Sequence, residues 1–129
     1  MNLPKMAKAK QIFHQQEIAD IPAKIKSELE AKNLKGRVIK GQRIAVTAGS
    51  RGISNIPMIL KTVVAEVKAI GAEPFILTAM GSHGGATPEG QIGVLHSLGI
   101  TEESVGAPIE AGMEVDVIGT LPDGVDVHL

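Results

Sequence analysis

An apolar run followed by a loop and a helical pattern occurs twice in the middle of this chain. An apolar run over residues 43–48 precedes a glycine-containing loop and a helical pattern over 56–70. A second run over 74–79 precedes another such loop and a helical pattern over 88–98. Short apolar runs favour buried strands, whereas apolar residues at a spacing of 3.6 favour helices. Strands joined by helices pair in parallel through right-handed crossovers, so the sequence predicts an α/β fold.

Cap and stop residues mark the ends of the predicted helices. Each helix has a polar N-cap residue and a proline within its first turn, which is typical of helix starts. The predicted N-caps are Asp20, Asn55 and Thr87. Each helix also meets a glycine, the residue that most often follows a helix. The predicted stops are Gly36, Gly71 and Gly99. The first helix therefore spans 21–36, and residues 1–20 form a lead-in.

The last thirty residues predict short elements and a turn. Residues 101–104 (TEES) predict a short helical turn, and alternating apolar residues at 113, 115 and 117 predict a half-buried strand. The turn signal Pro-Asp-Gly at 122–124 and the apolar Val125 and Val127 predict a C-terminal β-hairpin. No cap or polar tail follows Leu129. We therefore expect a fragment of a longer protein, with a naturally short chain as the alternative.

Composition excludes several classes of partner. The 129 residues have a formal net charge of -1, so no excess of positive charge would attract nucleic acid. The chain also lacks tyrosine and tryptophan, the side chains on which bases usually stack. No apolar stretch approaches the roughly 20 residues that a membrane helix needs. The chain contains no cysteine, which excludes disulfides and thiolate metal sites within it. We expect a cytoplasmic protein with no nucleic-acid or membrane partner.

Two loops are the candidates for a ligand site. Because parallel strands end at the same edge of a sheet, the loops 49–54 and 80–87 should lie side by side there. The first loop carries Arg51, whose guanidinium can bind a carboxylate or phosphate by two hydrogen bonds. The second carries His83, and an imidazole can give or take a proton near neutral pH. The alternatives are an exposed arginine and a structural histidine.

The loop after the first strand invites comparison with a nucleotide-binding motif. The segment AVTAGSRGIS is partly like the TGxxxGIG loop of short-chain dehydrogenases, whose glycines admit a pyrophosphate. Here Ala48 and Ser54 occupy the first and last glycine positions. That class also needs a tyrosine acid, and this chain has none. We therefore exclude a short-chain dehydrogenase.

The other histidines show no metal-ligand spacing. His14 and His128 are expected on the surface, and His96 is expected to be half-buried on its helix. None stands at a ligand spacing from His83, so the residues predict no metal site.

Four segments together carry a resemblance to a known family. They are AVTAGSRGI, IPMIL, GAEPFILTAMGSHGGATPEGQ and LGITEESVGAPI. From about Ile21 to the C-terminus, the chain resembles the N-terminal part of the lactate racemase family, the nickel-pincer-cofactor-dependent isomerases. The resemblance is closest to the branch with the GSHGGAT form. It implies a Rossmann-like parallel sheet flanked by helices, as a partial domain of a larger two-domain protein, with residues 21–129 as the family-like core.

The resemblance also implies roles for individual residues. The substrate would be a small 2-hydroxy acid that gives a hydride to a nickel-pincer nucleotide and takes it back on the other face. His83 would be the catalytic proton-transfer residue, and Arg51 would bind the substrate carboxylate, with help from Ser82. Residues that could contact the cofactor are Gly49, Ser50, Gly84, Gly85 and Thr87.

This sequence departs from the family pattern at Ala48, where the family often has an acidic residue, and this puts one cofactor contact in doubt. The second catalytic histidine, the tethering lysine and the nickel-binding histidine would lie beyond Leu129. The isolated chain would then be inactive and need a missing C-terminal segment as its partner. Two alternatives are a non-enzymatic module that binds nucleotide or phosphate, and a fragment that forms homo-oligomers through an exposed edge at residues 125–129.

Overall fold

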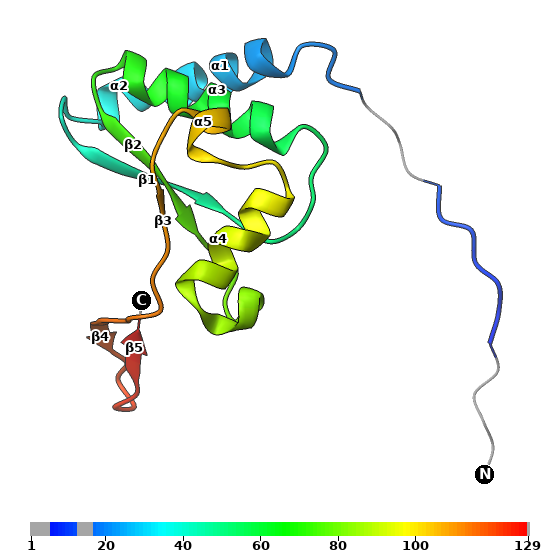
Figure 1. The fold of residues 1–129 in the computed structure, drawn as a ribbon, viewed down its shortest axis with the longest axis vertical. Coiled ribbons are helices and arrows are strands. Elements are labelled where there is room, and N and C mark those ends of the chain that lie inside the picture. The colour runs from blue at the N-terminus through cyan, green and yellow to red at the C-terminus, as the bar shows by residue number, and fades with distance from the viewer. Residues whose placement is uncertain (1–5, 13–16, 129) are drawn as a thin grey trace.

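The computed structural model describes residues 6–12 and 17–128 and has a three-stranded parallel sheet at its centre (Figure 1). The strands β1 (Arg43–Ala48), β2 (Glu73–Thr78) and β3 (Ile109–Glu110) lie in that order. The predicted first strand is confirmed residue for residue, and the second begins and ends one residue earlier than predicted. The α/β class and the parallel pairing are confirmed.

Helices α3 (Ile56–Ala69), α4 (Pro88–Ser97) and α5 (Glu102–Val105) pack with the sheet around one core. The buried members of that core are Ala48, Leu60, Val64, Ile76, Met80, Leu95, Ile100, Val105 and Ala107. Ile76, on the central strand, and Leu95, on α4, are both fully buried. The core thus joins the helices to the same face of β1 and β2, because side chains alternate between the faces of a strand.

Helix α1 (Ile21–Ala31) packs against α3, with the apolar stripe predicted at Ile21, Ile25 and Leu29 half-buried. The prediction of one helix as far as Gly36 is wrong. Asn33 takes a left-handed conformation, with φ +53°, and a separate short helix α2 (Leu34–Arg37) follows. Asparagine tolerates this conformation better than most residues, so the chain breaks there before it reaches the glycine.

The predicted helix starts are confirmed in position, but their caps differ. Asp20 Oδ1 accepts a hydrogen bond from Ala23 N at 2.9 Å, as an N-cap should. Asn55 precedes α3 but makes no capping bond, because it is left-handed at φ +62°. At the other end of α3, Gly71 has φ +87° and stops the helix as predicted.

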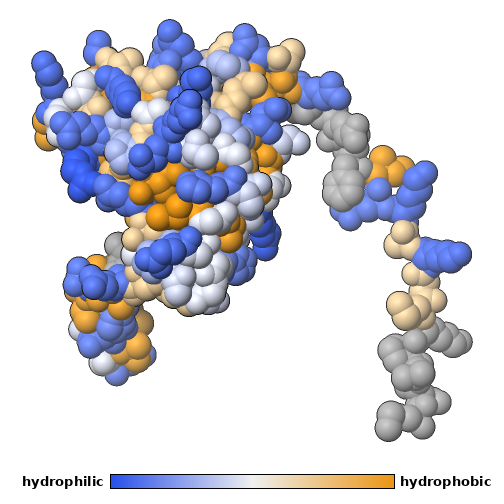
Figure 2. Space-filling model, viewed as in Figure 1, coloured by the Kyte–Doolittle hydropathy of each residue, from blue (hydrophilic) through white to orange (hydrophobic). Residues whose placement is uncertain are grey.

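The C-terminal hairpin is confirmed, with β4 (Val117–Thr120) antiparallel to β5 (Asp126–His128) and the turn at 122–124 between them. The half-buried strand expected around 113–117 is wrong. Residues 111–116 form no strand, and Val115 is 62% exposed. Alternation marks an extended chain, but burial also needs a neighbouring layer, and β4 is exposed throughout. In Figure 2 apolar surface shows on the hairpin.

The same structure settles three smaller predictions. The turn at 101–104 is confirmed as the start of α5, with a capping box between Thr101 and Ser104. His128 is exposed, as expected, whereas His96 is exposed rather than half-buried. His14 lies outside the described residues. Within the described chain, no helix combines the length and apolar character needed to cross a bilayer.

Candidate functional site

Two loops leave neighbouring strands at one edge of the sheet. Ala48 pairs with Thr78 at the carboxyl ends of β1 and β2, and Ala79 N donates to Ala48 O at 2.9 Å. The chain after β1 runs through residues 49–55 to α3. The chain after β2 runs through the short helix η1 (His83–Ala86) to α4. The predicted placement of the loops at a shared edge is confirmed.

The closest polar contact between the loops joins Ser50 to His83. Ser50 Oγ lies 2.5 Å from His83 Nδ1, a short hydrogen bond across 33 positions of sequence. Ser50 is half-buried and His83 is exposed. The structure therefore places the imidazole at the sheet edge with one ring nitrogen engaged by the other loop.

Arg51 follows Ser50 directly and is exposed. The ion pairs of the described residues join Lys24 to Glu28 and Arg43 to Glu110, so Arg51 takes part in neither. The two loops lie at one edge of the sheet, and the side chain that contacts the imidazole is that of Ser50. That Arg51 and His83 face one crevice stays a prediction. Ser82, the other expected substrate contact, is exposed. It lies on the same loop as His83, residues 80–87, which we call the histidine loop.

Left-handed backbone shapes the histidine loop. Gly84, Gly85 and Ala86 are consecutive residues with φ of +66°, +70° and +54°. Glycine adopts this conformation freely, whereas at Ala86 it costs about 1–2 kcal/mol. A hydrogen bond from Ala86 N to Ser82 O at 3.1 Å helps to hold the turn. The backbone therefore reverses sharply between His83 and the start of α4.

Gly84 and Gly90 allow this loop to fold back onto the first turn of α4. A Cβ built on Gly84 would lie 2.3 Å from Gly90 C, far inside the normal contact distance. Thr87 caps the same turn, because its Oγ1 accepts from Gly90 N at 3.1 Å. These contacts give Gly84 and Thr87 a role in building the loop, and the cofactor contact expected for both stays a prediction.

Gln91, on α4, holds the histidine loop in place through its side-chain amide. It was not identified as a site residue from the sequence. It is 3% exposed, and Thr78 Oγ1 donates to its Oε1 at 2.6 Å. Its Nε2 donates to Gly81 O at 2.8 Å. The amide therefore joins the end of β2 to the loop that carries His83. The position of Gln91 on the apolar side of the predicted helix could have indicated a buried polar contact.

Two of the other cofactor candidates are open glycines. Nothing lies within 4 Å of a Cβ built on Gly85, and the nearest atom to one on Gly49 is Ala79 O at 3.6 Å. A nucleotide could approach the backbone at these two positions. Among residues 6–12 and 17–128, no group of three or more histidine, aspartate or glutamate side chains could hold a metal ion.

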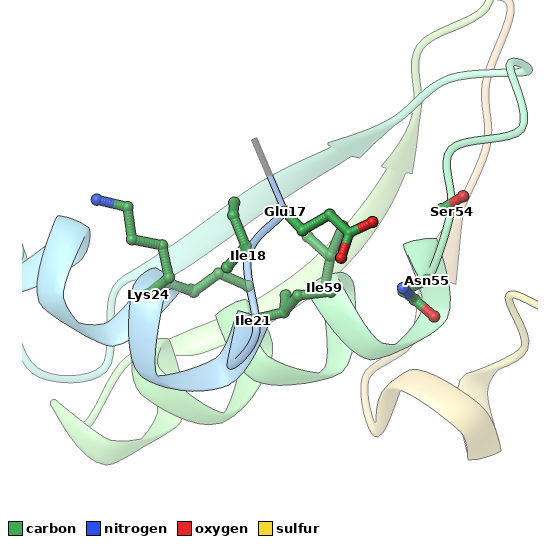
Figure 3. A pocket seen from close by; sticks show the side chains of 8 residues that line it. Glu17, Ile18, Ile21, Lys24, Ser54, Asn55 and Ile59 are labelled. Carbon is green, nitrogen blue, oxygen red and sulfur yellow. The ribbon is translucent and has the colours of Figure 1, made fainter. Parts of the chain in front are cut away.

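A cavity of about 720 Å³ lies elsewhere, where the lead-in, α1 and the start of α3 meet (Figure 3). The side chains that line it are Glu17, Ile18, Ile21, Lys24, Ile25, Ser54, Asn55 and Ile59. Its walls are mainly apolar. Lys24, the cation among the described residues that line it, is paired with Glu28 at 2.6 Å. It does not include Arg51 or His83.

No protein-family model matches this chain, and no curated protein or solved structure is significantly similar to it.

Proposed function

We propose that this chain is the N-terminal part of a cytoplasmic racemase or epimerase of 2-hydroxy acids, similar to the lactate racemases. The observation that carries the proposal is the hydrogen bond between Ser50 and His83. It holds His83, the proposed proton-transfer group, against the loop that carries Arg51, at the carboxyl edge of two parallel strands. That edge is the usual place for a ligand in open α/β sheets.

Arg51 would bind the carboxylate of the hydroxy acid. Its guanidinium is exposed, and a planar fork can hold both oxygens of a carboxylate. Fixing the acid in this way leaves the hydroxyl-bearing carbon free to present either face. With Nδ1 engaged by Ser50, Nε2 of His83 is the nitrogen that would take the hydroxyl proton and later return it.

The nickel-pincer nucleotide would supply the acceptor and donor of the hydride. Gly49 and Gly85 are the positions of this chain at which its nucleotide could approach the backbone. The nickel would need ligands from a further segment, which would also complete the active site. The isolated chain would bind the substrate without turning it over.

We also propose that the sheet belongs to a larger, Rossmann-like domain. The face of β2 opposite the core carries Phe75 and Leu77, both half-buried, and the Arg43 guanidinium lies 4.5 Å from the Phe75 ring centroid. Parallel sheets are almost always covered on both faces. A further layer on this face would complete the pattern.

Titration of the ¹⁵N-labelled chain with D- and L-lactate tests the site. We expect both enantiomers to shift the side-chain signals of Arg51 and His83, with the Arg51→Ala variant losing at least about tenfold in affinity, since a charge-assisted pair contributes roughly 1.5–3 kcal/mol. Arg37→Ala, an exposed arginine on α2, is the matched control.

The same titration with AMP separates this proposal from a nucleotide-binding module. Shifts with AMP and none with lactate would contradict the racemase function, and so would lactate binding that Arg51→Ala leaves unchanged. A chain that responds to neither ligand would contradict it as well.

A further inference from the structure

The sequence did not predict the hydrogen bond between Ser50 and His83, and either residue could be its donor. Ser50 was expected to contact the cofactor, but its hydroxyl is already used by the imidazole, 2.5 Å from Nδ1. The hydroxyl can accept a hydrogen bond from Nδ1–H, or donate one to a bare Nδ1. Which of these holds decides which ring nitrogen can act as a base.

We infer that Ser50 is a positioning residue that holds His83 as the Nδ1–H tautomer and leaves Nε2 as the base. This rests on the proposed function. The neutral base must carry its proton on Nδ1 if Nε2 is to accept one. The imidazolium formed after proton transfer carries protons on both nitrogens. Ser50 Oγ can accept from Nδ1–H in both states, so its hydrogen bond survives the whole cycle.

The proton balance of this step is simple. The O–H bond of the substrate breaks, its proton forms an N–H bond at Nε2, and the alkoxide electrons stay with the substrate. The reverse transfer restores the neutral imidazole. Ser50 keeps its own proton throughout, because it acts only as an acceptor from Nδ1–H.

The backbone on both sides of the contact is well supported. His83 N donates to Met80 O at 3.3 Å, and Met80 is buried in the core. Gln91 holds Gly81 O on the same loop. On the other side, Ser50 follows the end of β1 by two residues, at the point where Ala48 O accepts from Ala79 N. Both partners therefore stand on chain segments fixed to the sheet, which a positioning role requires.

Long-range ¹H–¹⁵N spectra of the histidine ring test this inference in the chain itself. In spectra recorded at alkaline pH, the two nitrogens of a neutral imidazole report its tautomer. We expect a protonated Nδ1 and a bare Nε2 for His83. The Ser50→Ala variant should move both signals toward a mixture of tautomers, and Ser50→Thr, which keeps the hydroxyl, should restore them.

Ser54→Ala is the matched control, because Ser54 is an exposed serine of the same loop. It should leave the His83 signals unchanged. A wild-type His83 protonated on Nε2 would overturn the inference, and so would signals that do not respond to Ser50→Ala. Lactate binding and its loss in Arg51→Ala are measured separately, so failure of this inference can be told apart from failure of the proposed function.

In the enzyme loaded with its cofactor, Ser50→Ala should lower kcat about tenfold and change KM little, as expected for the loss of one hydrogen bond that orients a base. Ser50→Thr should stay within about threefold of the wild type. An unchanged kcat in Ser50→Ala would also overturn the positioning role.

Discussion

Gly84 and Gly90 are packed so closely that neither has room for a side chain. A Cβ built on Gly90 would lie 1.7 Å from Gly84 O. We expect Gly90→Ala to displace the histidine loop and to destabilise the chain by about 2–3 kcal/mol, the upper range for overpacking. Urea unfolding measures the stability, and the His83 ring signals report the displaced loop.

The control for this prediction is on the same helix. Gly93 lies one turn further along α4, and a Cβ there would have nothing within 4 Å. Gly93→Ala should therefore raise the stability by about 0.5–1 kcal/mol, because alanine is the better helix former. Equal effects of the two substitutions would contradict the close contact between loop and helix.

The Lys24 side chain lowers the pKa of Glu28 on helix α1. Its Nζ donates to Glu28 Oε1 at 2.6 Å, and its positive charge adds to the effect of the hydrogen bond. The folded state therefore favours the ionised carboxyl. The stabilisation is present above the unfolded-state pKa and is lost as the pH falls through the lowered pKa of the folded state. Lys24→Met should raise the pKa of Glu28 toward its usual value.

Carbon-detected NMR titration of the Glu28 carboxyl checks that prediction. Lys26→Met removes a neighbouring exposed lysine of the same helix and should leave the pKa of Glu28 lowered. A carboxyl that titrates identically in wild type and Lys24→Met would refute the pairing.

Asp20 and Asn55 stand at equivalent helix starts, yet only Asp20 makes a capping bond. Asp20→Ala should lower the stability by about 1 kcal/mol, since the amide of Ala23 loses its acceptor. Asn55→Gly should stay within about 0.5 kcal/mol of the wild type, because glycine suits φ +62° and no side-chain bond is lost. Thermal unfolding of both variants measures the difference.

The elements that were predicted correctly are determined by residues close together in the sequence. The strand at 43–48 and the helix start at Thr87 follow from a short apolar run and from a cap followed by proline. Parallel pairing then brings the two loops to one edge without further information. The break at Asn33 is also local, but asparagine is compatible with both a helix and a left-handed turn, so the pattern alone did not decide it.

The features that the sequence missed depend on packing between segments. Gly84 and Gly90 must be glycines because the folded loop packs against the helix there, and the sequence does not show that these two segments meet. The hydrogen bond between Ser50 and His83 links residues from different loops, so no spacing rule could find it. Val115 shows the converse, since its alternating pattern predicted burial that no neighbouring layer provides.

Gln91 joins the central strand to the histidine loop through one buried amide. Gln91→Ala should lower the stability by about 2–3 kcal/mol, because Gly81 O loses its donor and the side chain of Thr78 loses its acceptor. Hydrogen exchange at residues 81–86 should accelerate at the same time. Gln42→Ala, which removes an exposed amide bonded to Ile39 N, should cost under about 1 kcal/mol.

A double-mutant cycle with Thr78→Val isolates the link between strand and loop. If the two side chains act together, Thr78→Val should cost about 1 kcal/mol less in the Gln91→Ala background than in the wild type. Strictly additive effects would show that the hydroxyl and the amide stabilise the chain independently. The Gln91 amide would then hold Gly81 O without help from the Thr78 hydroxyl.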